Sequence, residues 1–253
     1  MLLAAKDALI EAACRPYLAA TPWAYYFARA KLTHDPVFMA LLRSGRFRDG
    51  ARVLDLGCNL AVMASLMLSA RERFEAGLWP SDMPVPPAQL HLHGIECNGR
   101  IARRAKIALG SRAMIHTMDL REATLPVADV ILLIDVLHYL EAAAQLALLE
   151  KIARSLCHGG LLVLRIADSG AGWRFHLGRM ADRFGLPMHK RVFARHHHRP
   201  LADWLRLLDS LGFSAVTEAG GAGETFANKL IWADTAPASR VESRRTLAAQ
   251  QAG

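Results

Sequence analysis

Apolar residues recur at three- and four-residue spacing through the first fifty positions of the 253-residue chain. This is the spacing of a helix with one buried face, and it predicts helices over residues 4–13, 23–32 and 36–42. Pro16 and Pro22 separate the first of these helices from the second, because proline removes a backbone donor and interrupts a helix. The chain therefore opens with a helical segment.

From residue 51 onward, short apolar runs alternate with amphipathic segments. The predicted strands are residues 52–56, 90–95, 113–117, 127–134 and 161–166, and the predicted helices among them are residues 61–70, 99–109 and 142–156. Strands that alternate with helices indicate a parallel sheet with helices on both faces. Residues 78–87 contain four prolines without periodicity and are expected to form a surface excursion.

The last elements follow a different order. Residues 200–211 are predicted to form a helix, and residues 213–218 and 226–233 two strands joined by a glycine-rich loop. A link this short allows an antiparallel pair and is too short for a crossover between parallel strands. We therefore expect a parallel sheet that ends in an antiparallel pair.

The sequence VLDLGCNLA at residues 53–61 combines an apolar strand, an acid and a glycine. Gly57 lets the chain turn tightly, so that backbone amides can come close to a ligand, and Asp55 is expected to anchor the turn. Asn59 suits such a turn, because asparagine enters the left-handed conformation more readily than most residues.

This sequence resembles the first motif of the class I S-adenosylmethionine-dependent methyltransferases, a strand followed by Asp-x-Gly-x-Gly-x-Gly. Asn59 replaces the second glycine of that motif, and Ala61 replaces the third, where its methyl group would narrow the pocket. The resemblance implies that the turn binds the amino-acid portion of S-adenosylmethionine through Asp55, Leu56, Gly57 and Asn59.

Later motifs are in register with the same family. Glu96, with Cys97 beside it, ends the second predicted strand, where the family binds the two ribose hydroxyls. Asp119 and Leu120 follow the third strand, where the family places an acid against the adenine amino group. Asp135 follows the fourth strand and opens a sequence, DVLHY, that resembles the family's fourth motif. The resemblance implies that these five residues also bind the cofactor.

CHGG at residues 157–160 resembles the family's Pro-Gly-Gly turn and completes a set of motifs over residues 53–165. The set implies an α/β, Rossmann-like class I methyltransferase fold, with a mostly parallel seven-stranded sheet and a terminal antiparallel strand pair. A nicotinamide-binding fold is disfavoured, because its G-x-G-x-x-G fingerprint needs glycines where the chain has Asn59 and Val62.

The expected organisation follows from these motifs and from composition. It consists of an N-terminal helical lid (residues 1–50), a methyltransferase domain (51–234) that includes a basic insert or lid (168–200), and a disordered tail (235–253). The tail is polar, small and rich in arginine, and such a composition buries too little apolar surface to fold.

His138 is the candidate catalytic residue. It follows the fourth strand, where its imidazole is expected to act as a general base toward the methyl acceptor. The alternative is that His138 only shapes the pocket, because many methyltransferases work by aligning the nucleophile with the sulfonium.

Most of the net charge of +8 lies in one region, residues 174–199, and the remainder lies in the tail at residues 235–253. Residues 174–199 contain seven lysines or arginines against one acid, Asp182. Such a region steers acidic partners, and an acidic acyl carrier protein that presents the acceptor would fit. Residues 23–42 and 199–204 loosely resemble a bacterial methyltransferase group associated with aryl polyene and xanthomonadin-type pigment clusters. A solvated face that only maintains solubility is the competing interpretation.

Two other functions stay open. Ala61 is compatible with a degenerate, non-catalytic cofactor-binding or scaffold protein. An RNA methyltransferase is disfavoured, because the basic charge is confined to one insert and no RNA-binding module is recognised, so no nucleic-acid partner is expected. The expected acceptor is a small or carrier-bound molecule.

Other features narrow the setting. The apolar run at residues 130–134 ends at Asp135, well short of the ~20 residues that span a bilayer, and no secretory signal is recognised. Four scattered cysteines indicate a reducing compartment, and we expect a cytoplasmic protein. Residues 196–198 are consecutive histidines, whose side chains point in different directions, so a basic loop is favoured over a metal site.

Overall fold

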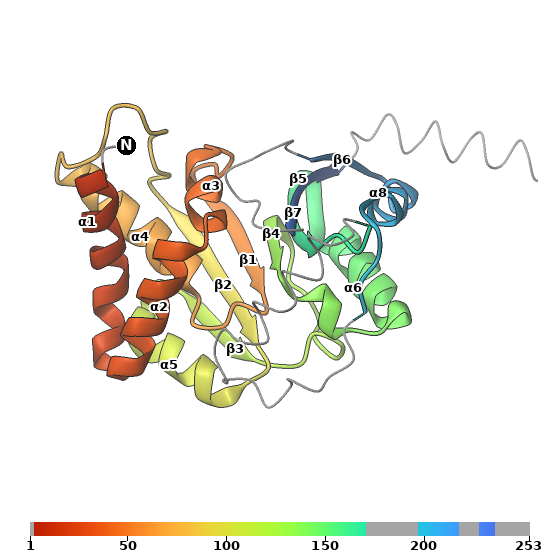
Figure 1. Cartoon of the computed structure of the whole chain (residues 1–253), viewed down its shortest axis with the longest axis horizontal. Helices are drawn as coiled ribbons and strands as arrows, with labels where there is room; N and C mark the ends of the chain where they lie inside the picture. The colour runs from red at the N-terminus through yellow and green to blue at the C-terminus, as the bar shows by residue number, and fades with distance from the viewer. Residues whose placement is uncertain (1–2, 171–196, 218–227, 236–253) are drawn as a thin grey trace, which may run out of the picture. The chain divides into compact units, whose positions relative to one another are not determined.

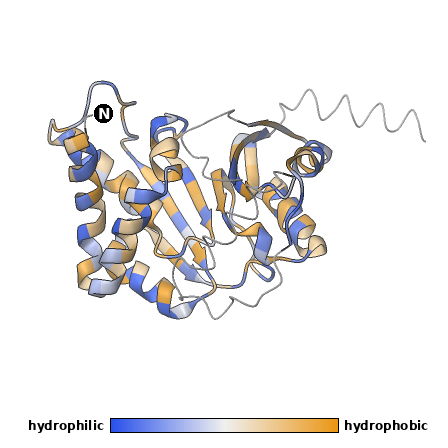
Figure 2. Cartoon of the chain, viewed as in Figure 1, coloured by the Kyte–Doolittle hydropathy of each residue, from blue (hydrophilic) through white to orange (hydrophobic). Residues whose placement is uncertain are grey.

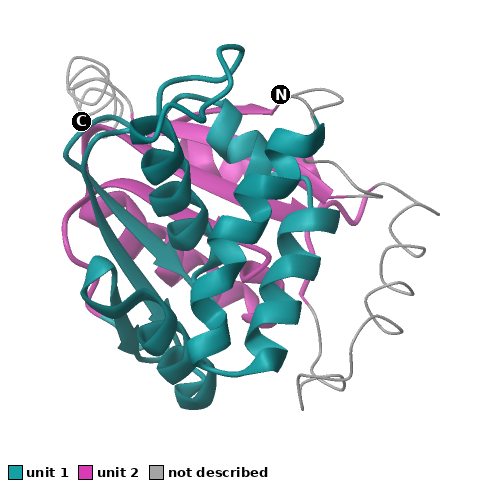
Figure 3. Ribbon diagram, turned by 90° about the vertical axis from the view of Figure 1, so that its left-hand side faces the viewer, with its two compact units in different colours: residues 1–123, 220–225 teal, residues 124–219, 226–253 magenta. Residues whose placement is uncertain are grey.

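The protein divides into two compact units in a computed structural model that describes residues 3–170, 197–217 and 228–235 (Figures 1 and 3). Unit 1 comprises residues 1–123 and 220–225, and unit 2 comprises residues 124–219 and 226–253. Most of the basic insert, the loop between the last two strands and the predicted disordered tail lie outside the described residues.

Unit 1 contains a small parallel sheet and most of the helices. Its helical elements are α1 (Leu3–Cys14), η1 (Arg15–Ala19), α2 (Pro22–His34), α3 (Val37–Arg43), α4 (Val62–Glu75), α5 (Gly99–Leu109) and η2 (Gly110–Arg112). Its strands are β1 (Ala51–Leu56), β2 (Leu90–Glu96) and β3 (Met114–Thr117), and β2 lies between the other two, parallel to both. The carboxyl ends of all three strands therefore meet at one edge.

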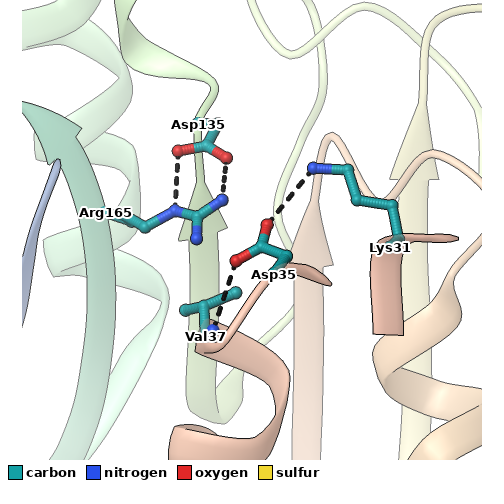
Figure 4. A network of polar contacts seen from close by, with 5 residues as sticks. All are labelled: Lys31, Asp35, Val37, Asp135 and Arg165. Carbon is teal, nitrogen blue, oxygen red and sulfur yellow. Dashed lines mark hydrogen bonds and ion pairs between the residues drawn. The ribbon is translucent and has the colours of Figure 1, made fainter. Parts of the chain in front are cut away.

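Local sequence explains where these helices begin. Thr21 accepts a hydrogen bond from Ala24 N at 3.1 Å at the start of α2, and Asn98 accepts from two amides at the start of α5. Between α2 and α3, Asp35 Oδ1 accepts from Val37 N at 3.2 Å, and Oδ2 lies 3.3 Å from Lys31 Nζ (Figure 4). Each of these side chains satisfies donors that a helix end leaves without a partner.

The N-terminal helices pack into unit 1. One buried apolar face of α1, with Leu9 and Ala13, lies against α4. Ser65 of α4 donates a hydrogen bond to Ala13 O at 2.7 Å, and both groups are buried. This packing forms part of the core of unit 1. The role of these helices as a lid stays a prediction.

Unit 2 contains the antiparallel end of the chain. Its elements are β4 (Ala128–Ile134), η3 (Leu137–Tyr139), α6 (Ala142–Ser155), β5 (Leu156–Ala167), α8 (Leu201–Ser210), β6 (Phe213–Thr217) and β7 (Asn228–Thr235). β4 and β5 are parallel, whereas β7 runs antiparallel to both β5 and β6. Apolar residues dominate β4 and β5, and Figure 2 shows this concentration.

The strand order is β3-β2-β1-β4-β5-β7-β6 in a mixed seven-stranded sheet. This order confirms the predicted fold class, a mostly parallel Rossmann-like sheet that ends in an antiparallel pair. Within the described residues, no helix has the length and apolar content that crossing a membrane requires.

The start of β5 differs from the prediction. We expected a strand over residues 161–166 after a turn, but β5 begins at Leu156, directly after α6. Leu156 pairs with Ala128 and Leu161 with Val130, so the CHGG sequence bulges out between two paired segments. Gly159 has a φ of 70°, which allows this bulge.

Candidate functional site

The loop after β1 contains three residues with left-handed backbone conformation. Gly57, Asn59 and Ala61 have φ angles of 73°, 53° and 53°. Ala61 N also donates a hydrogen bond to Cys58 O at 2.7 Å, which closes the turn before α4. Asn59 and Ala61 therefore take the conformation that glycine adopts most easily, at the two positions where the predicted motif departs from the family pattern.

Hydrogen bonds attach this loop to the neighbouring strand. Gly57 N and Cys58 N both donate to Ile95 O of β2, at 2.8 and 3.0 Å. The side chain of Asn59 accepts a hydrogen bond from Leu60 N at 2.8 Å. The loop is thus held in one shape by its own residues and by β2.

Glu96 ends β2 with a buried side chain that is central to this site. Its Oε2 accepts from Asn59 N at 3.1 Å, and its Oε1 accepts from Asn98 N at 2.7 Å and lies 3.5 Å from Cys97 Sγ. A carboxylate has about four acceptor positions. Glu96 thus joins the loop after β1 to the end of β2 and keeps capacity to accept hydroxyl groups.

Asp55 is the next-to-last residue of β1, and the pKa of its carboxyl group is unusual. Burial, and after it the nearby Glu96 carboxylate, raise the pKa of its carboxyl group from 3.8 to about 7. Burial, followed by the same two carboxylates, also raises the pKa of the Cys58 thiol well above its ordinary value. A site with these properties favours a positively charged ligand, which would let Asp55 ionise.

The remaining predicted cofactor residues of unit 1 differ in exposure. Asp119 follows β3, and its carboxylate accepts three hydrogen bonds from Arg121, at 2.9, 3.0 and 2.7 Å. The arginine side chain is 63% exposed, and such surface pairs contribute little free energy, so a ligand can compete for Asp119. The side chains of Leu56 and Leu120 are buried, whereas Cys97 is exposed.

Tyr17 is a supporting residue that the sequence did not indicate. Its hydroxyl donates a hydrogen bond to Leu60 O at 2.7 Å, in the loop after β1. The Tyr17 side chain is completely buried, and burial raises the pKa of its hydroxyl far above the ordinary range. The hydroxyl therefore stays protonated and donates, which links η1 to the candidate cofactor loop.

In unit 2, Asp135 follows β4 with a φ of 59°, which is strained for a residue other than glycine. Arg165 of β5 holds its carboxylate with two hydrogen bonds: Nε donates to Oδ1 at 2.8 Å, and Nη2 donates to Oδ2 (Figure 4). Arg165 is 3% exposed. A single arginine in the otherwise apolar LLVLRIA strand was the sequence signal for this partner.

His138 lies in η3, between two other rings. Its imidazole is stacked on that of His198, with ring centroids 5.5 Å apart, and lies 4.1 Å from the ring of Tyr139. His197 N donates a hydrogen bond to His138 O at 2.9 Å. In the described part of the chain, no three His, Cys, Asp or Glu side chains come together as a possible metal site.

Comparison with known proteins shows the family to which the chain belongs. A family model described as a methyltransferase domain matches residues 26–218, which is most of the chain, and the protein belongs to this family. The match confirms the predicted family, with S-adenosylmethionine as the cofactor of its class. It covers the loop after β1, Glu96, Asp119, Asp135 and His138.

Individual relatives are more distant. The carboxy-S-adenosyl-L-methionine synthase of Chromohalobacter salexigens is 28% identical over 131 residues, which cover 50% of this chain and 43% of that protein. The chain thus spans less than half the length of this curated relative.

Solved structures show the same fold. Magnesium protoporphyrin IX methyltransferase from Synechocystis PCC 6803, with bound SAH, has a TM-score of 0.55 at 18% identity, over 85% of this chain and 89% of that one. Mitomycin 7-O-methyltransferase has a TM-score of 0.56 at 18% identity, over 85% of this chain and 58% of that one. At these identities the likeness is one of fold.

Proposed function

We propose that the protein transfers a methyl group from S-adenosylmethionine to a small-molecule or carrier-bound acceptor, with S-adenosylhomocysteine as the second product. The observation that carries this proposal is the Glu96 carboxylate, which is buried at the end of β2 and joined to the loop after β1. Together with the family match, it supports a cofactor site at the carboxyl ends of β1, β2 and β3.

The residues of unit 1 fit such a cofactor. Glu96 has one acceptor position beyond its present contacts, and the weak thiol donor of Cys97 is easily displaced, so two ribose hydroxyls can be accommodated. Asp55 favours a positive charge, which the ammonium and sulfonium groups of the cofactor supply. Gly57 and Asn59 present backbone close to the amino-acid portion, and Asp119 is placed for the adenine amino group.

We propose that His138 acts as a general base toward the methyl acceptor. A neutral imidazole can accept a proton from a hydroxyl or amine as the methyl group is transferred. Asp135 is held by Arg165 in a strained conformation, as is common at functional sites, and we include it among the cofactor residues. When bound, S-adenosylmethionine supplies the electrophilic methyl group.

Isothermal titration calorimetry with S-adenosylhomocysteine tests this function. The wild-type protein should bind, and Glu96→Ala should weaken binding by about 1–3 kcal/mol, the cost of losing hydrogen bonds to a charged group. Glu75→Gln, an exposed substitution in α4, is the matched control and should bind as the wild type does. No detectable heat with folded wild-type protein would contradict the methyltransferase function and favour a scaffold.

The acceptor is best identified in extracts. Incubation with S-adenosylmethionine labelled in its methyl group, followed by fractionation, should reveal a labelled product. The loose resemblance to enzymes of polyene pigment clusters favours an unsaturated or aromatic acceptor from secondary metabolism. Labelling of RNA and of no small or carrier-bound molecule would overturn this part of the proposal.

An acidic acyl carrier protein is the partner that the basic insert favours. Six of its seven basic residues lie outside the described residues. The seventh, Arg199, donates hydrogen bonds to Gln145 and to Ala142 O within unit 2, so it contributes to the fold of that unit. The docking charge would therefore come from the other six.

We also propose that the protein works in the cytoplasm. None of the four cysteines, all of which lie within the described residues, forms a disulfide, and Cys14 and Cys58 are buried. Burial raises the pKa of the Cys14 thiol to about 12, so this group stays protonated and unreactive. Cysteines that form no disulfide suit a reducing compartment.

A further inference from the structure

A glutamine is completely buried in the first turn of α6. The side chain of Gln145 has an exposed fraction of 0%, which is unusual for this residue type. A buried amide is costly unless all its groups form hydrogen bonds. The partners of Gln145 therefore show what this position does.

The partners come from two distant segments. Gln145 Nε2 donates to Leu137 O at 3.0 Å, to Leu140 O at 3.1 Å and to His197 O at 2.9 Å. Its Oε1 accepts from Arg199 Nε at 2.8 Å. Because carbonyls surround one end of the amide and a guanidinium the other, only one orientation of the amide group is possible.

The partners of Gln145 are neighbours of His138. Leu137 and Leu140 flank it in the turn after β4, and His197 also donates its own N–H to His138 O at 2.9 Å. The next residue, His198, stacks its ring on that of His138. Both the backbone and the ring of His138 are therefore fixed by segments that meet at Gln145.

Arg199 strengthens the same junction. It donates to Ala142 O at 3.2 Å, at the start of α6, and its guanidinium lies 5.4 Å from the ring centre of Trp204 in α8. Residues 197–199 are thus bound to α6 and α8 while they contact the turn that carries His138. All of these residues belong to unit 2.

We propose that Gln145 is a positioning residue: it joins the turn at residues 137–140 to residues 197–199 and so fixes the His138 imidazole for the reaction. This inference rests on the proposed function for the role of His138, but the junction itself does not. Small displacements of a reacting group reduce the rate strongly, by up to about 100-fold for 1 Å. A residue that prevents such a displacement therefore affects turnover without touching a substrate.

Gln145→Met tests the junction. Methionine has similar length and flexibility but no donor, so it fills the space and leaves three carbonyls without their amide partner. Ser155→Ala is the matched control, because Ser155 is also buried in α6 and donates to a carbonyl, Leu125 O at 3.3 Å, at the other end of the helix. Both variants should lose some stability.

Two measurements distinguish positioning from general stability. In NMR spectra of histidine-labelled protein, Gln145→Met should shift the His138 and His198 ring signals and their pH titration, whereas Ser155→Ala should leave them unchanged. Hydrogen exchange at the His197 amide, which donates to His138 O, should become at least roughly tenfold faster in Gln145→Met alone. Unchanged ring signals and exchange in folded Gln145→Met would overturn the junction.

A double-mutant cycle then tests the link to the reaction. Turnover is measured with S-adenosylmethionine labelled in its methyl group and the extract fraction that the wild type labels. Gln145→Met should reduce turnover roughly tenfold or more, and no further when His138 is already alanine, because residues that act through one another are not additive. Equal losses in both backgrounds would overturn the positioning role. If the wild type neither binds S-adenosylhomocysteine nor labels any fraction, the proposed function fails, and the NMR comparison still decides the junction.

Discussion

At the scale of single residues, several residues of the candidate site have a backbone conformation or a protonation state that is unfavourable for their residue type. Asn59, Ala61 and Asp135 all have positive φ angles, which cost on the order of 1–2 kcal/mol for an alanine or larger residue. The pKa of Asp55 is about 7, so this residue keeps its proton well above pH 3.8, where an aspartate ordinarily loses it. Such costs are common where a protein is shaped for a ligand, because the ligand and the surrounding hydrogen bonds offset them.

The pKa of Asp55 predicts a pH dependence of stability and of binding. A raised carboxyl pKa stabilises the folded protein most below pH 3.8, and this contribution is lost as the pH rises to about 7. Asp55→Asn removes this loss and should stabilise the ligand-free protein at pH 8 by up to about 4 kcal/mol. Unfolding in urea at pH 8 and at pH 4 measures the difference, which should be small at pH 4.

Binding should follow the same ionisation in the opposite direction. The ammonium group, which S-adenosylhomocysteine shares with S-adenosylmethionine, prefers ionised Asp55, so affinity for S-adenosylhomocysteine should rise roughly tenfold from pH 6 to pH 8 in the wild type. The Asp55→Asn variant should bind more weakly at pH 8 and lose this dependence, whereas Glu75→Gln should keep it. A flat profile in the wild type would show that Asp55 does not meet the cationic part of the cofactor.

Ala61 predicts a contrast between two substitutions. Ala61→Gly relieves the strain of the left-handed conformation, but it removes a buried methyl group and raises the conformational entropy of the unfolded chain. Because these effects oppose one another, the free energy of unfolding should change by less than about 1 kcal/mol. Cofactor affinity should stay similar or improve. Ala61→Val should destabilise by more than about 2 kcal/mol, because a branched side chain is poorly tolerated at positive φ. Urea unfolding and calorimetry measure both. Cofactor binding by Ala61→Gly alone, and not by the wild type, would show that the alanine has disabled the site.

The sequence predicts the acids of the candidate site but not the residues that support them. Asp55 and Glu96 lie at the ends of their strands, Asp119 follows the next strand, and all three stand out in a local motif. Arg165 stands out as a single arginine in an apolar strand, but it contacts a residue 30 positions away, and Tyr17 contacts one 43 positions away, so no local pattern names either partner. Long-range partners of this kind require the folded chain to be seen.

At the scale of elements, helix ends with clear capping residues were predicted best. The helix at residues 99–109 has the expected bounds, because Asn98 caps its start and Gly110 follows its end with a φ of 58°. β5 was predicted to begin five residues too late, because pairing between Leu156 and Ala128 extends it beyond its apolar run. The short 3-10 helices were not predicted, since they lack a periodic signal.

Packing between β1 and β2 depends on a glycine. A side chain added at Gly94 would place its Cβ 2.7 Å from Cys58 Sγ and 2.9 Å from Ile115 Cδ1. Gly94→Ala should therefore destabilise unit 1 by about 1–3 kcal/mol and weaken cofactor binding, because Cys58 belongs to the loop after β1. Gly99→Ala, where the nearest atom is 3.6 Å away, is the control and should be tolerated.

The double variant with Cys58→Ala identifies the cause. Removing the thiol sulfur relieves the closer of the two contacts, so Gly94→Ala should cost less in the Cys58→Ala background. Thermal unfolding of the four proteins in this cycle gives the coupling. Additive effects would mean that Gly94 is needed for another reason, such as strand geometry.

At the scale of the whole molecule, the order of elements predicted a parallel sheet that ends in an antiparallel pair, and the resemblance to the family's motifs predicted the class I methyltransferase fold. Alternating strands and helices, followed by two strands with a short link, correspond to the observed order β3-β2-β1-β4-β5-β7-β6. The acceptor could not be predicted in the same way, because one fold accommodates many acceptors and the choice depends on individual side chains. The uneven charge of the chain is the remaining feature at this scale.

That charge predicts how the protein meets an acidic carrier. Arg191 and Arg195 belong to the basic region at residues 174–199, which holds seven basic residues and one acid. Reversing both to glutamate should reduce turnover on a carrier-bound acceptor and weaken its dependence on salt, while affinity for S-adenosylhomocysteine stays unchanged. Arg103→Glu with Lys106→Glu makes the same change in net charge on exposed positions of α5 and should leave turnover unaltered. Unaltered turnover of the Arg191/Arg195 variant at low salt would mean that the basic region serves solubility and not docking.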